Sequence, residues 1–178
     1  MNDSLMPHDG RASGVDVARA NGDDSPRTPL IDERDRRKQV ALVAAHRPAV
    51  LLLGGDLAPH GAGAEGVRRQ RLFLQGFFVE FARRVREAAP GLELLVLLGN
   101  DDWSVNQDVL EAHDRTLWRM LHGGVVEVDG GGVAGLSWVP ITPFGMKDWE
   151  RWEDAAAEDP LRLDGWRSHV GGIEPMRF

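Results

Sequence analysis

Two continuous apolar runs stand out along the chain. Ala49–Leu53 is followed by a Gly-Gly pair, and Leu94–Leu98, within the predicted strand Leu92–Leu98, is followed by Gly99. Neither run alternates with polar residues, and this lack of alternation is typical of a strand that is buried on both faces. We therefore predict two strands inside a parallel β-sheet.

Three further segments carry apolar residues at helical spacing. They are residues 31–46, Val67–Ala88 and Asp108–Leu121. Apolar residues at three- and four-residue intervals predict amphipathic helices, each with one face against a core. The order helix, strand, helix, strand predicts an α/β protein in which helices are layered on a central sheet.

The remainder of the chain gives weaker signals. Val125–Val128 and Val133–Val139 flank a glycine-rich turn and predict a β-hairpin. Beyond Pro140 the periodicity is lost, and no element is predicted there. Residues 1–30 contain few large apolar residues and predict a disordered tail ahead of one folded unit at 31–178.

Composition excludes several classes of protein. The chain has 178 residues and a net charge of −7, which argues against a protein that binds duplex nucleic acid through a basic face. It contains no cysteine, so disulfides, thiolate metal sites and cysteine nucleophiles are excluded. The apolar runs are too short to cross a bilayer, and the acidic start of the chain does not resemble a secretory signal. We therefore expect a cytoplasmic protein without a membrane partner.

Oxygen-bearing side chains follow both predicted strands. Asp56 follows the first strand, and Asn100, Asp101 and Asp102 follow the second. Ligands of open α/β sheets bind beyond the carboxyl ends of the strands. Carboxylates gathered at one such edge would repel one another, and a divalent cation would remove that conflict. The sequence therefore predicts a metal site at this edge.

These segments resemble the motifs of a known enzyme family. Leu-Leu-Leu-Gly-Gly-Asp at 51–56 and Leu-Leu-Gly-Asn-Asp-Asp at 97–102 look like the second and third motifs of the calcineurin-like metallophosphoesterases, which read Gly-Asp and Gly-Asn-His-Asp/Glu. Residues 139–151, with the sequence Lys-Asp-Trp-Glu, are similar to a prokaryotic subfamily of the same fold. The resemblance covers the middle of the family's domain, and it implies a calcineurin-like α/β fold and a bacterial hydrolase.

The resemblance also implies a chemistry. Asp56 would bridge two divalent ions, Asn100 would bind one of them, and Asp101 stands where the family usually has a histidine that assists the leaving group. A metal-bound hydroxide would hydrolyse a phosphoester, with Mn, Fe or Zn as the suitable metals. Residues expected to support the loops or to lie within reach of the site are Gly55, Gly99, Asp102 and His60.

Two family motifs have no counterpart in the sequence. No apolar strand ending in Asp-x-His precedes Ile31, and no Gly-His-x-His follows the third motif. The family's first strand and C-terminal part would then be missing, which predicts a truncated, mis-started or inactive relative. A missing strand leaves the edge of its neighbour unpaired, so homo-oligomerisation is also expected.

Two other functions remain open. A non-catalytic interaction protein on the same fold would explain the missing ligands. Gly61–Gly66 spells G-x-G-x-x-G between a strand and a helix, as in a dinucleotide-binding module, although its first glycine does not directly follow the strand. Tryptophans that could stack on a base or anchor a core are Trp138, Trp149, Trp152 and Trp166.

Overall fold

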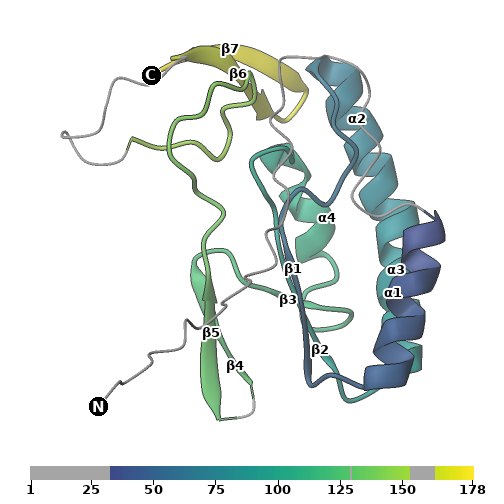
Figure 1. Cartoon of the computed structure of the whole chain (residues 1–178). Helices are drawn as coiled ribbons and strands as arrows, with labels where there is room; N and C mark the ends of the chain where they lie inside the picture. The colour runs from purple at the N-terminus through teal and green to yellow at the C-terminus, as the bar shows by residue number, and fades with distance from the viewer. Residues whose placement is uncertain (1–32, 129, 153–162) are drawn as a thin grey trace, which may run out of the picture.

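A three-stranded parallel sheet forms the centre of the fold. The structure is a computed structural model that describes residues 33–128, 130–152 and 163–178. Strands β1 (Val50–Gly54), β2 (Glu93–Leu97) and β3 (Arg119–Met120) lie in the order β1-β2-β3. Helices cover one face of this sheet and a β-hairpin lies at the other face (Figure 1).

The helical face is built from two long helical segments. Helix α1 (Glu33–His46) packs beside α3 (Val79–Ala88). Helix α2 (Gly63–Phe73), a π-helical turn (Leu74–Phe78) and α3 follow one another without a break. The predicted helix at Val67–Ala88 is therefore confirmed, and it starts earlier, at Gly63.

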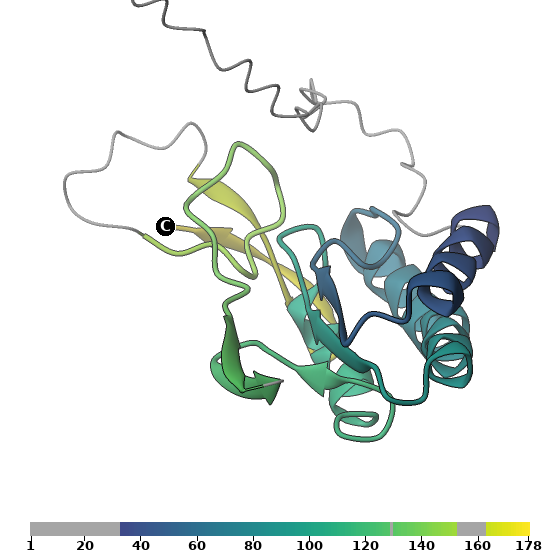
Figure 2. The same cartoon turned by 60° about the horizontal axis from the view of Figure 1, so that its bottom comes forward.

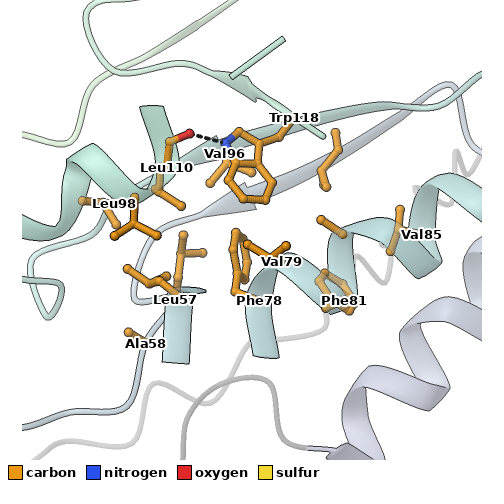
Figure 3. Close-up of a cluster of buried hydrophobic side chains, with 14 of the residues drawn as sticks. Leu57, Ala58, Phe78, Val79, Phe81, Val85, Val96, Leu98, Leu110 and Trp118 are labelled. Atoms are coloured by element: carbon orange, nitrogen blue, oxygen red, sulfur yellow. Dashed lines mark hydrogen bonds between the residues drawn. The ribbon is translucent and has the colours of Figure 1, made fainter. Parts of the chain in front are cut away.

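The main core lies between these helices and the sheet. Phe78 and Phe81 from the helical segment face Val96 and Leu98, which come from β2 and the residue after it (Figure 3). The ring of Trp118 packs 5.2 Å from that of Phe78, centroid to centroid. The Trp118 indole N–H donates to the Leu110 carbonyl at 2.9 Å, so its polar edge is satisfied inside the core.

The second face of the sheet has a smaller core. Leu95 packs there with Leu121 and Val126, and the β4–β5 hairpin supplies the covering residues. Strand β2 is therefore buried on both faces, as predicted. For β1 that prediction is wrong, because Leu52 is 51% exposed. Strand β1 is one of the two edge strands of the sheet among the described strands, and the smaller core covers it only in part.

The predicted helix at Asp108–Leu121 is also wrong beyond its first turns. A 3₁₀ turn (Ser104–Asn106) leads into a short α4 (Gln107–Glu111). The chain then turns through Arg115, whose φ is 62°, and enters β3. The Asp114 carboxylate accepts the Met120 N–H at 2.9 Å and holds this turn. His113 therefore lies outside α4, although it falls within the predicted range.

Two antiparallel hairpins complete the described chain. Strands β4 (Gly124–Val128) and β5 (Gly131–Gly135) confirm the predicted hairpin, although β5 ends well before Val139. Strands β6 (Asp164–His169) and β7 (Gly172–Arg177) form a second hairpin, which the sequence pattern did not predict. Figures 1 and 2 show this hairpin near the start of α2, at the end of the sheet where β1 and β2 finish.

The fold prediction is confirmed as a mixed α/β protein with helices packed on a central sheet. The predicted tail at residues 1–30 lies outside the described residues. Within the described ranges, no helix is both long and apolar enough to cross a bilayer.

Candidate active site

The ends of β1 and β2 meet at one edge of the sheet. The parallel register places Gly54 beside Leu97. A Cβ on Gly55 would lie 2.7 Å from the Gly99 Cα, and a Cβ on Gly99 would lie 2.3 Å from Asp56 Oδ1. Both positions therefore require glycine, because any side chain would push the two loops apart.

Asp56 bridges the two loops. Its backbone has a φ of 51°, a left-handed conformation that aspartate tolerates better than most residues. Its Oδ1 accepts the Asp101 N–H at 3.1 Å. Burial raises the pKa of Asp56; the Asp101 N–H and nearby His60 oppose this rise, and the Asp101 carboxylate adds to it. A cation beside Asp56 would lower this raised pKa and favour the charged form of the carboxylate.

Asp102 braces the same two loops from inside the protein. Its Oδ2 accepts the N–H groups of Leu57 and Gly99 at 3.0 and 2.9 Å, and its Oδ1 accepts that of Ala58 at 2.9 Å. Burial raises the pKa of Asp102 to about 6, against the effect of these three N–H groups. Its oxygens are committed to the backbone, so it serves as a loop-supporting residue.

Asn100 and Asp101 lie at the same edge as Asp56. Asn100 is half-buried between Gly99 and Asp101, both of which contact Asp56. The Asp101 carboxylate contacts His60 Nδ1 at 3.0 Å. The structure thus brings His60 to the candidate site, beside Asp101.

Gln70 positions this segment, a role that the sequence pattern did not predict. Its side chain is buried on α2, where its amide N–H donates to the Asp101 carbonyl at 2.7 Å. Its Oε1 accepts the Trp103 N–H at 2.8 Å. The sequence signal for this role was a glutamine at a core-facing position of an amphipathic helix. A buried side-chain amide needs hydrogen-bond partners, so it indicates a structural contact.

The Lys-Asp-Trp-Glu segment is buried and contains an internal ion pair. The Lys147 and Glu150 side chains are both 0% exposed, and their Nζ and Oε2 lie 2.6 Å apart. Lys147 Nζ also donates to the Thr142 carbonyl at 2.8 Å, and the Thr142 hydroxyl donates to Glu150. These contacts fix the loop at 142–150 and leave its charged groups unavailable to a ligand.

The two central residues of that segment attach it to the site. The Asp148 carboxylate accepts the Ser104 N–H and the Ser168 N–H, both at 2.7 Å. The Trp149 indole N–H donates to the Asp102 carbonyl at 2.8 Å. This segment therefore ties the loop after β2 to the β6–β7 hairpin.

The donor set can be compared with the two divalent ions that the resemblance implies. In the described part of the chain, no group of three or more His, Cys, Asp or Glu side chains is arranged to hold a metal ion. Asp102 is bonded to backbone N–H groups, and Asp101 contacts His60. The remaining oxygen donors, Asp56 and Asn100, fit part of the coordination of one ion. They do not fit a two-metal centre, which needs several more ligands.

The glycine signature at 61–66 has a packing explanation. A Cβ on Gly66 would lie 2.1 Å from the Gly61 carbonyl oxygen, so the loop touches the first turn of α2 at this point. The Trp103 indole N–H donates to the same carbonyl at 2.9 Å. These contacts require glycine without any bound dinucleotide.

No protein-family model matches the chain, and no curated protein or solved structure matches it either. The resemblance to the calcineurin-like metallophosphoesterases therefore rests on the motifs alone.

Proposed function

We propose that this chain acts on phosphoesters with the help of a divalent metal ion held by Asp56 and Asn100. The observation that carries the proposal is the meeting of the two strand ends, where Asp56 Oδ1 accepts the Asp101 N–H. The carboxylate of one motif thus contacts the backbone of the residue that follows the asparagine of the other. This is the edge at which ligands of parallel α/β sheets bind.

The chain's own residues would have distinct roles in this function. Asp56 and Asn100 would supply oxygen ligands, and Asp102 would hold both loops at the required separation. Asp101 and His60 border the site, where an unpaired carboxylate would repel a phosphate group. The contact at 3.0 Å between His60 and Asp101 reduces that repulsion whenever the imidazole carries a proton.

Metal titration and hydrolysis assays test the proposal. Isothermal titration with Mn²⁺ and Zn²⁺, followed by assays with aryl phosphomonoesters and phosphodiesters, should show metal binding and metal-dependent turnover. Asp56→Asn and Asn100→Ala should each remove most of both signals, and Glu111→Gln, an exposed position on α4, should leave them unchanged. A folded native protein that neither binds metal at millimolar concentration nor hydrolyses any of these esters overturns the proposal.

A second candidate function is that of a non-catalytic interaction protein on the same fold. The shortage of ligands for a metal ion within the described residues favours it. It predicts normal folding of the native chain with no turnover in any of the assays above. If the native chain binds NADH and Gly63→Val abolishes this binding, the dinucleotide-binding alternative is favoured instead.

A further inference from the structure

A pocket of about 400 Å³ lies next to the candidate active site. Its polar end is formed by His60 and Asp101, and its walls by Trp103, Phe144 and Trp166. This volume lies within the range of small-molecule sites, which are mostly apolar with a few polar groups. The proposed metal site at Asp56 and Asn100 accounts for neither the aromatic walls nor the volume of this pocket.

The walls of the pocket are aromatic, and hydrogen bonds fix the Trp103 ring and the backbone of Trp166. Trp103 is buried, with both its backbone and its indole N–H bonded. The backbone of Trp166 exchanges hydrogen bonds with Gly145 and Lys147, at 2.8 and 2.9 Å. The side chains of Phe144 and Trp166 nevertheless remain 40% and 43% exposed. Aromatic rings that stay partly exposed around a cavity suit a flat ligand, which would cover them by stacking.

The polar end selects for hydrogen-bond donors. His60 contacts Oδ2 of the Asp101 carboxylate, and the negatively charged carboxylate favours ring N–H or amino groups over a phosphate at its other oxygen. The same residue contacts Asp56 through its backbone N–H. Asp101 therefore stands between the pocket and the proposed metal ligands, and one ligand can extend from one to the other.

We propose that this pocket binds the planar heteroaromatic group of a nucleotide-like phosphoester, whose phosphate extends toward Asp56 and Asn100. The inference rests on the proposed function for the position of the phosphate. The pocket itself requires no metal, because its walls and its polar end are formed by side chains of the described residues.

Binding measurements without metal test the pocket separately. Titration calorimetry and saturation-transfer NMR, with a chelator present, should detect adenosine and adenosine 5′-monophosphate but not glycerol phosphate. Trp166→Ala and Phe144→Ala should each weaken adenosine binding about tenfold, as expected for the loss of one stacking partner. Trp138→Ala is the matched control, since Trp138 is 47% exposed and does not line the pocket.

The outcomes separate the two proposals. Adenosine binding that both pocket variants weaken, without hydrolysis of any phosphoester, supports the pocket and overturns the phosphoesterase function. Metal-dependent hydrolysis with no adenosine binding up to millimolar concentration supports the function and overturns the pocket. Binding that all three variants leave unchanged also overturns the pocket. If Trp166→Ala fails to fold, as judged by its melting curve, Phe144→Ala decides the matter.

Discussion

Replacing Asp102 by alanine should destabilise the protein strongly, because its carboxylate joins the two loops of the candidate site. The side chain is 1% exposed and accepts three backbone N–H groups. Each buried donor left without a partner costs about 1–3 kcal/mol. The variant no longer buries the negative charge of the Asp102 carboxylate, and this offsets part of the loss. We therefore expect a net loss of about 3 kcal/mol in the free energy of unfolding at pH 7.

The pH dependence of this loss has a definite sign. Burial raises the pKa of Asp102 from 3.8 to about 6, so the folded protein binds this proton more tightly than the unfolded chain does. The contribution of Asp102 is therefore fully present below the unfolded pKa of 3.8 and is lost as the pH rises through the folded pKa. At about 1.4 kcal/mol per pKa unit, the change between pH 4 and pH 7 is about 2 kcal/mol. The Asp102→Ala variant should lose about 2 kcal/mol more at pH 4 than at pH 7.

Urea unfolding followed by tryptophan fluorescence, with a chelator present, measures both effects. Asp108→Ala is the control, because Asp108 is an exposed carboxylate that pairs with Arg71 at 2.7 Å. Loss of such a surface pair should cost less than about 1 kcal/mol. If Asp102→Ala costs no more than the control at pH 7, the bracing role is wrong. If the cost falls toward pH 4, the direction of the Asp102 pKa shift is wrong.

Three further predictions concern stability and assembly. Lys147→Met should lower the free energy of unfolding, measured in urea, by about 3–5 kcal/mol because it leaves the Glu150 carboxylate buried without its cation. The double variant Lys147→Met, Glu150→Met should recover much of this loss. An equal loss in the single and double variants would contradict this prediction. Gly66→Ala should lower the free energy of unfolding by about 2 kcal/mol, because the new Cβ clashes with the Gly61 carbonyl. Gly76→Ala is the control. It should be neutral or stabilising, because its new Cβ has open space around it. The native chain should self-associate through β1 in light scattering, and Leu52→Lys should reduce this association; a monomer at all concentrations would refute that prediction.

The sequence predicted the elements whose signals are local. The unit β1, α2, α3 and β2 follows from two uninterrupted apolar runs and one long helical period, each bounded by glycine or proline. The region after α4 could not be predicted in this way, because the leucine spacing there continues the helical pattern. Trp118 instead enters the core beside Phe78, and that tertiary contact replaces the helix.

The C-terminal hairpin shows a different reason for failure. Trp166 in β6 pairs with Pro175 in β7, and half of the residues in each strand are exposed, so neither strand shows a clear apolar alternation. The available signal was the pair Gly171-Gly172, whose φ values of 111° and 152° suit a tight turn. A glycine pair without flanking apolar alternation is weak, because such pairs also occur in ordinary loops.

The candidate site could be predicted in position but not in composition. Parallel strands must end at the same edge, so the proximity of the Asp56 and Asn100 loops follows from two motifs and one connecting helix. The partners of the other acidic residues depend on segments distant in sequence. Asp102 is bonded to Leu57, and Asp148 to Ser168. These two carboxylates are thus used as acceptors of backbone N–H groups. The affinity for a divalent ion should therefore depend on the donors that remain at this edge, Asp56 and Asn100. It should not depend on the total number of acidic residues in the motifs.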